Sequence, residues 1–191
     1  GYFLADILSQ ETNSDLLATY KKDVGTLDFN VSLGGNIMHR ESSASSVGSG
    51  DNRNNGLSTP GVYNVRNIPL DNIKVESSVS EKAIYSLYAL ASIGFNDQVY
   101  LDITGRNDWS STLPADNRSY FYPSASLSWL TNYTFDLPQN INMLKVRAGW
   151  AQVGNDTDPY RLYTSLNTGN YNTVSTVSVS PELLNPNLLP E

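Results

Sequence analysis

The sequence has no cysteine and a single histidine among its 191 residues. Without cysteine there is neither a disulfide framework nor a thiolate metal site. With His39 as the only histidine, a metal site built from histidines within the chain is excluded. A Ser-His-Asp triad would have to use this one residue. We therefore expect that the chain is not an enzyme and that it binds no metal and no cofactor.

Charge is also scarce. Charged residues make up 16% of the chain, against the roughly 25% usual for soluble domains. The net charge is -7, which argues against nucleic acid as a partner, because phosphates require clustered Lys and Arg. Long apolar runs are missing as well. No stretch approaches the ~18 apolar residues that a membrane-spanning helix needs, so a bundle of membrane helices is excluded.

What the sequence has in quantity is tyrosine, at 12 residues, together with small polar residues. In several segments the apolar residues fall at every second position, which is typical of a β-strand with one polar and one apolar face. The clearest case is the segment 83–108, where two such arms flank the turn Asn96-Asp97-Gln98. The apolar set is Tyr85, Leu87, Ala89, Ala91, Ile93 and Phe95 on the first arm and Val99, Leu101 and Ile103 on the second. This pattern predicts an antiparallel hairpin.

The same alternation predicts strands over residues 2–9, 16–22, 27–39, 120–130, 143–153, 160–166 and 173–179. Residues 10–14 are polar and predict a turn between the first two. Gly34 and Gly35 predict a bulge or bend in the third. The Ser-, Gly- and Asn-rich segment 40–82 and the polar segment 105–120 predict long loops, which in compact folds are usually functional.

Two geometries explain one polar and one apolar face. In a soluble β-sandwich, such as a carbohydrate-binding module, the apolar faces oppose each other in a closed core. In a transmembrane barrel they face lipid, and the polar faces line the lumen. Short turns alternating with long loops favour the membrane form, as do aromatic residues near strand ends that would form a girdle. These aromatics are Tyr120, Tyr122, Trp129, Tyr133 and Trp150. A complete small barrel of about eight strands is a third possibility, and it requires a closed ring.

Four motifs, taken together, resemble a known family. Gly-Arg-Asn-Asp-Trp-Ser-Ser at 105–111 is similar to the R-x-D-x-S-S signature of SusC/RagA-type TonB-linked outer-membrane proteins. The strand from Tyr122 to Trp129 is similar to a Pro-Ser-containing strand of that family that ends in Trp. The segment 144–155, ending in Val-Gly-Asn, and Asn-Pro-Asn-Leu-Leu-Pro-Glu at 185–191 resemble two later motifs. The motifs occur in the family's order.

The resemblance implies an all-β fold, an antiparallel meander of transmembrane-barrel type. Residues 1–191 would form a partial barrel wall with long outward loops, without the plug domain and the carboxy-terminal strands. It also implies a place in the outer membrane of a Gram-negative, Bacteroidetes-type bacterium. The implied function is the import of glycan or peptide fragments, energised through TonB, with a SusD-like surface lipoprotein as partner. TonB would act through parts outside this chain, and the wall would contact membrane lipid.

Three aromatics in the predicted loops are candidate ligand contacts: Tyr63, Trp109 and Tyr120. Flat aromatic faces beside polar groups suit sugar rings, although a packing role is the common alternative for such residues. Arg106, on a polar face, is expected to pair with Asp102 or Asp108 rather than with substrate. Asn155 to Asp158 is expected to be a solvated turn.

Overall fold

The fold was obtained as a computed structural model that describes residues 1–50, 56–135, 138, 140–171 and 174–190. Six strands form one sheet in the order β1-β2-β3-β4-β5-β6, so each strand pairs with its neighbour in sequence. A separate hairpin pairs β7 with β8. The bounds are β1 Phe3–Val24, β2 Leu27–Ser49, β3 Ile73–Phe95, β4 Val99–Ser110, β5 Ser119–Leu130, β6 Lys145–Ala151, β7 Leu166–Tyr171 and β8 Val174–Val179. Short 3-10 helices lie at Val65–Asn67 and Thr131–Tyr133.

This order confirms the predicted antiparallel meander and partial barrel wall. Within the described residues the meander ends at β1 on one side and at β6 on the other, without pairing between these two strands. A complete small barrel is therefore not what this chain forms. The described residues contain no helix long and apolar enough to cross a membrane.

The chain divides into two compact units. The first comprises residues 1–12 and 39–82, and the second comprises residues 13–38 and 83–191. In the first unit, polar side chains of β1 and β2 pair across the two strands. Arg40 Nε donates to Glu11 Oε2 at 2.8 Å, and the Ser9 and Ser42 hydroxyls lie 3.0 Å apart. Such cross-strand pairs hold the register of long, exposed strands.

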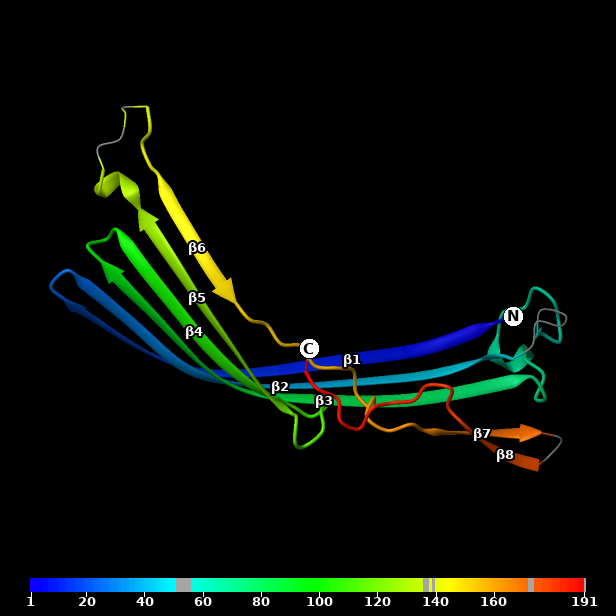
Figure 1. Ribbon diagram of the computed structural model, residues 1–191. Helices are drawn as coiled ribbons and strands as arrows, with labels where there is room; N and C mark the ends of the chain where they lie inside the picture. The colour runs from blue at the N-terminus through cyan, green and yellow to red at the C-terminus, as the bar shows by residue number, and fades with distance from the viewer. Residues whose placement is uncertain (51–55, 136–137, 139, 172–173, 191) are drawn as a thin grey trace. The chain divides into compact units, whose positions relative to one another are not determined.

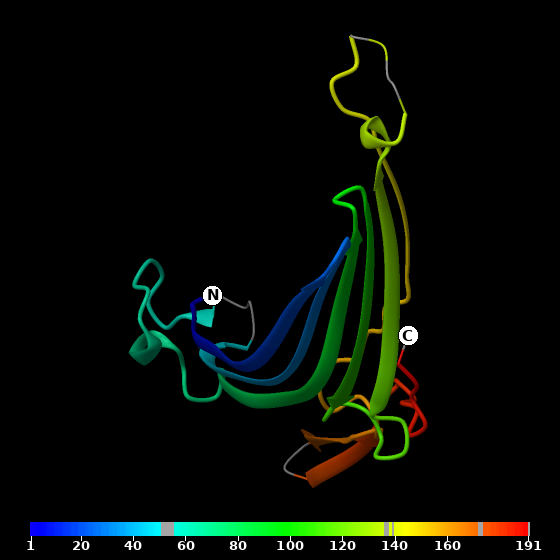
Figure 2. The same ribbon diagram turned by 90° about the vertical axis from the view of Figure 1, so that its left-hand side faces the viewer.

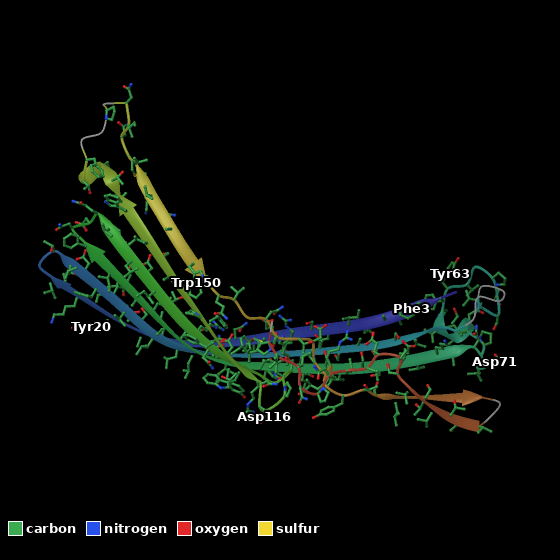
Figure 3. The ribbon with its side chains drawn as sticks, in the orientation of Figure 1. Phe3, Tyr20, Tyr63, Asp71, Asp116 and Trp150 are labelled. Carbon is green, nitrogen blue, oxygen red and sulfur yellow. The ribbon has the colours of Figure 1, made fainter. Side chains whose placement is uncertain are left out.

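The connection from β2 to β3 in the first unit is compact where the structure describes it, from residue 56 to residue 72. The Asn67 side chain accepts from the Thr59 amide at 2.9 Å and donates to the carbonyl oxygens of Thr59 and Val62, both at 2.7 Å. Leu57 and Ile68 are buried. Tyr63 stands exposed in this connection (Figure 3). One asparagine thus holds together the loop that presents Tyr63.

In the second unit, β3, β4, β5 and β6 follow one another side by side (Figures 1 and 2). The register pairs Tyr85 with Trp109, Ala91 with Ile103 and Leu101 with Leu127. Because side chains alternate along a strand, these residues share one apolar face. Leu87 is 61% exposed and Ile103 is 45% exposed. The described sheet therefore does not bury this face against a second sheet, and the β-sandwich alternative is wrong.

Strand length fits the membrane form. A strand crosses a bilayer with about 9–11 residues when it is tilted, and β4 and β5 have 12 residues each. By contrast, β1 has 22 residues, and β2 and β3 have 23 each. Their residues within the second unit already match β4 and β5 in length. The remainder, which belongs to the first unit, exceeds what a membrane crossing requires.

Several predicted boundaries are wrong. The turn at 10–14 does not form, because β1 runs without a break from Phe3 to Val24. The predicted loop at 40–82 is strand up to Ser49 and again from Ile73, and the predicted loop at 105–120 shortens to residues 111–118. Ser, Gly and Asn are common in loops, but cross-strand hydrogen bonds keep these polar segments extended as strands. The strand predicted at 160–166 begins only at Leu166 and continues to Tyr171. The strand predicted at 173–179 is found from Val174 to Val179, and Thr173 lies outside the described residues.

Gly34 is explained by its neighbour on β3 rather than by a bulge, because β2 is continuous there. A Cβ atom at Gly34 would collide with the Tyr88 ring. Glycine therefore allows a tyrosine to lie flat across β2 on the polar face of the sheet. This contact places the Tyr88 ring beneath Arg106, where the candidate site begins.

Candidate functional site

The most highly organised side chains lie on the polar face of the second unit, where β4 ends. The register places Arg106 between Tyr88 on β3 and Tyr122 on β5, and it places Asp108 between Ser86 and Tyr120. These residues alternate with the apolar set along the same strands, so all of them project to the opposite face. The strand pattern alone therefore gathers one cation, one carboxylate and three tyrosines on neighbouring positions.

Arg106 and Asp108 form the centre of the cluster. Arg106 Nε donates to Asp108 Oδ1 at 2.8 Å, and Arg106 Nη2 donates to the Ser86 hydroxyl at 2.8 Å. The Arg106 guanidinium carbon lies 5.7 Å from the centroid of the Tyr88 ring, within the range of a cation–π contact. The Tyr122 hydroxyl donates to Asp108 Oδ2.

Asp108 is only 5% exposed. A carboxylate this buried is tolerated only when it is paired with a cation and hydrogen-bonded, because its desolvation is costly. Arg106 supplies the charge and Tyr122 the second donor. This confirms the prediction that Arg106 pairs with an acidic residue of its own face. Of the two predicted partners, Asp102 and Asp108, the ion pair forms with Asp108. Asp102, further along β4, makes a longer contact with the Ser126 hydroxyl at 3.4 Å.

A second carboxylate, Asp156, reaches the cluster from the segment that follows β6. Its Oδ2 atom accepts from the Ser110 hydroxyl at 2.5 Å and from the Thr112 hydroxyl at 3.2 Å. Ser110 and Thr112 are both buried. The expectation of a solvated turn at 155–158 is therefore wrong for Asp156. Its carboxylate ties the segment 152–159 to the end of β4 and to the start of the loop 111–118.

Glycine and tyrosine packing supports this connection. A Cβ atom at Gly154 would lie 2.8 Å from Cδ2 of Tyr120, so the ring leaves room only for glycine. Tyr120 in turn stacks on Tyr122, with the ring centroids 5.8 Å apart and the planes at 28°. The Val-Gly-Asn motif at 153–155 thus lies against the aromatic pair of β5.

We call the set Ser86, Arg106, Asp108, Ser110, Thr112, Tyr120, Tyr122 and Asp156 the polar network. It also holds the loop 111–118, because the Ser110 amide donates to the Arg118 carbonyl oxygen at 3.0 Å. Asn117 of that loop donates to the Leu188 carbonyl oxygen at 3.4 Å. The arrangement suits positioning rather than chemistry. The described residues hold no cluster of three or more His, Cys, Asp or Glu that could bind a metal ion.

Beside the network, the same face has an open hollow of about 440 Å³. Its lining includes Tyr88, Leu90, Thr104, Arg106, Tyr122 and Gln152. The Thr104 and Ser124 hydroxyls, 2.5 Å apart, form part of its wall. Hydroxyl, amide and guanidinium groups beside apolar carbon could contact a polar molecule that passes along this face.

Of the three predicted ligand contacts, Trp109 and Tyr120 do not come together. Trp109 lies within β4, not in a loop, and on the apolar face, since it pairs with Tyr85. Tyr120 lies within β5 on the polar face and belongs to the polar network. Trp109 and Tyr120 are therefore on opposite sides of the sheet. Tyr63 alone is in a loop, in the other compact unit.

The predicted aromatic girdle is likewise only partly correct. Trp129 and Trp150 belong to the apolar face, since they pair with Val99 and Ala125 (Figure 3 labels Trp150 on β6). Tyr120 and Tyr122 belong to the polar face and do not form a girdle. The side chain of Tyr133 lies outside the described part of the structure. The sequence did not predict the contacts of Ser86 with Arg106 or of Asp156 with Ser110. The one available signal was that Ser110 and Gly154 both lie in motifs of the same family.

A sheet with one exposed apolar face, one face with a hydrogen-bonded polar network, and strands of bilayer-crossing length defines a membrane β-barrel wall. The sequence matches the TonB-dependent receptor-like β-barrel family over residues 2–191. The chain belongs to this family, whose members are outer-membrane transporters and receptors of Gram-negative bacteria rather than a class of enzymes. This match confirms the predicted membership of a family of TonB-linked outer-membrane barrels.

Solved structures share the fold. The structure of the RagAB peptide transporter aligns with a TM-score of 0.77 at 20% identity, over 98% of this chain and 21% of that chain. The RagAB peptide importer in its "closed-closed" state aligns with a TM-score of 0.75 at 20% identity, over 97% of this chain and 21% of that chain. This chain thus spans about a fifth of the length of these proteins. No curated protein matches the sequence.

Proposed function

We propose that this chain is a wall segment of an outer-membrane nutrient transporter of a Gram-negative, Bacteroidetes-type bacterium. The transporter imports glycan or peptide fragments, is energised through TonB, and works with a SusD-like surface lipoprotein. The observation that carries the proposal is the two-faced sheet of the second unit in a chain of this family. The apolar face meets lipid, and the polar face lines the path of the substrate. The similar RagAB structures, which are named as peptide transporters, support this reading.

The length of the strands supports a place for the partner. The ends of β1, β2 and β3 that belong to the first unit exceed what the bilayer requires. Those of β1 and β2 carry the ion pair between Arg40 and Glu11 and the hydroxyl pair of Ser9 and Ser42, which suit an aqueous surface. We place the lipoprotein partner and the loop that presents Tyr63 on this side. Contact with TonB is made by other parts of the transporter.

The proposal is tested by deleting the full-length gene and measuring uptake. Two probes are used in parallel, a fluorophore-labelled mixture of short peptides and a labelled mixture of glycan fragments of similar size. Uptake of one mixture should disappear on deletion, return with the full-length gene and disappear again when TonB is removed. Recovery of the protein outside the outer-membrane fraction, or uptake that does not depend on TonB, would contradict the proposal.

Of the three candidate ligand contacts, Tyr63 is the one we propose to touch the imported molecule. Replacing Tyr63 by alanine should lower the apparent affinity for the transported mixture about fivefold to tenfold, because an aromatic contact contributes about 1 kcal/mol. The comparison variant is Trp109→Ala, which removes an aromatic ring from the apolar face. Equal affinities of the Tyr63 variant and the wild type in a concentration series would remove Tyr63 from the site.

A further inference from the structure

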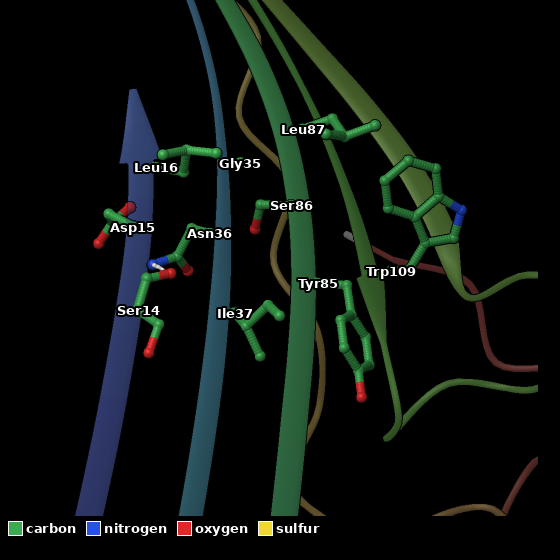
Figure 4. Close-up of a pocket in the computed structure, with 10 residues that line it drawn as sticks. All are labelled: Ser14, Asp15, Leu16, Gly35, Asn36, Ile37, Tyr85, Ser86, Leu87 and Trp109. Atoms are coloured by element: carbon green, nitrogen blue, oxygen red, sulfur yellow. Dashed lines mark hydrogen bonds between the residues drawn. The ribbon is translucent and has the colours of Figure 1, made fainter. Parts of the chain in front are cut away.

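The apolar face of the second unit is not smooth. It contains a hollow of about 520 Å³ whose lining includes Leu16 of β1, Gly35 and Ile37 of β2, Tyr85 and Leu87 of β3, and Trp109 of β4. Figure 4 shows these side chains arranged around Gly35. Ser14, Asp15, Asn36 and Ser86 complete the lining. Ser86 directs its hydroxyl to Arg106 on the polar face, so its backbone forms part of the floor.

The hollow exists because Gly35 interrupts a row of large side chains. On the apolar face, Gly35 follows Leu33 and precedes Ile37, which are both exposed. A Cβ atom at Gly35 would lie 3.4 Å from Cδ2 of Leu87 and 3.5 Å from the Ser86 carbonyl oxygen. These are ordinary contact distances, so neither crowding nor backbone conformation requires glycine here. At Gly34 the reverse holds, because the Tyr88 ring occupies the space.

We propose that this hollow holds one acyl chain of a membrane lipid. This inference rests on the proposed function, in which the apolar face of the wall meets the bilayer. The hollow is continuous with that face, and its side chains on the apolar side are aliphatic or aromatic apart from Ser14. A depression lined by aliphatic and aromatic side chains suits a hydrocarbon chain, because burial of apolar surface stabilises the bound chain.

Tyr85 and Trp109 indicate the level in the bilayer at which the hollow lies. Tyr85 and Trp109 face each other directly across β3 and β4, close to the end of β4 at Ser110. Tyr and Trp are enriched where the hydrocarbon core meets the headgroups. The bound chain therefore enters beside Tyr85 and Trp109, with its headgroup at their level, and runs inward over Gly35. A partner protein needs a broader interface than this single depression provides.

Filling the hollow tests the inference. The Gly35→Leu variant of the full-length transporter is purified in mild detergent, delipidated and titrated with phosphatidylethanolamine carrying one palmitoyl and one oleoyl chain. Native mass spectrometry counts the lipids that are retained. The variant should retain one lipid fewer than the wild type, or bind the tightest lipid about tenfold more weakly. Gly35→Ala should show a smaller loss in the same direction, which keeps the test valid if Gly35→Leu folds poorly.

The matched control is Ala91→Leu. It places a leucine on the same apolar face of the sheet, on β3 and outside the hollow. It should retain lipid like the wild type. Equal lipid retention in the wild type, Gly35→Leu and Gly35→Ala overturns the inference, as does a change in oligomeric state without a change in lipid. If the protein is absent from the outer-membrane fraction altogether, the proposed function fails instead, so the two failures are distinguishable.

Discussion

Replacement of Asp108 by alanine is expected to lower the stability of the folded barrel. Asp108 is 5% exposed and accepts from both Arg106 and Tyr122. Breaking a buried pair by removing one partner costs about 3–5 kcal/mol, because the other charge loses its partner. Since the Arg106 side chain is 38% exposed, we expect a value of about 3 kcal/mol.

The measurement is the temperature at which the folded full-length barrel unfolds in detergent, read from the migration of unheated and heated samples on a gel. Asp102→Ala is the matched control, because Asp102 lies on the same strand and face with one long contact to Ser126. It should leave the unfolding temperature nearly unchanged. If Asp108→Ala and Asp102→Ala unfold at the same temperature, the ion pair does not stabilise the wall. Asp108→Asn should lie between Asp108→Ala and the wild type, because it keeps the shape and loses the charge.

Replacement of Asp156 by alanine is expected to free two segments at once without unfolding the sheet. Asp156 accepts from Ser110 and Thr112, which belong to the end of β4 and the beginning of the loop 111–118. Hydrogen bonds to a charged group contribute about 1.5–3 kcal/mol each. Loss of both hydrogen bonds should lower the free energy of local opening of the two segments by about 3 kcal/mol. This corresponds to about a hundredfold faster hydrogen exchange in them.

Hydrogen–deuterium exchange of the full-length protein checks this expectation. Exchange should become faster in peptides that cover 111–118 and 152–159, while peptides from the middle of β4 and β5 should keep their protection. Asp158→Ala is the control, because Asp158 lies two residues away in the same segment and is exposed. Should the Asp156 variant exchange like the Asp158 variant in both segments, the carboxylate would have no anchoring role. Uptake measured alongside shows whether the anchored loop is needed for transport.

The contrast between Gly34 and Gly35 shows what a sequence pattern can miss. Both glycines predicted a bulge, yet β2 is continuous. Gly34 makes room for the Tyr88 ring on the polar face, whereas Gly35 leaves an unfilled hollow on the apolar face. Alternation along β2 places the two on opposite faces, but their neighbours come from β3, about fifty positions later in the chain. Only the pairing of the strands reveals what each glycine faces.

Asp156 makes the same point for the polar network. Its local sequence, Asn-Asp-Thr-Asp, is typical of a solvated turn. Its partners, Ser110 and Thr112, lie more than forty positions earlier. No local signal specifies such a contact, because it depends on where the segment after β6 crosses the polar face.

The two-residue alternation by itself predicted a sheet of antiparallel strands with one polar and one apolar face, and it left the sandwich and the membrane barrel open. The resemblance of the motifs to a known family, rather than the alternation, indicated a TonB-linked barrel. Alternation is a local property, since each residue's face follows from its neighbours along the strand. The tertiary structure alone decided that Arg106 pairs with Asp108, that Tyr120 and Trp109 lie on opposite faces, and that β2 and β3 extend into the predicted loop at 40–82 from both ends. Each of these depends on register between strands, and register is set by contacts between residues far apart in the chain.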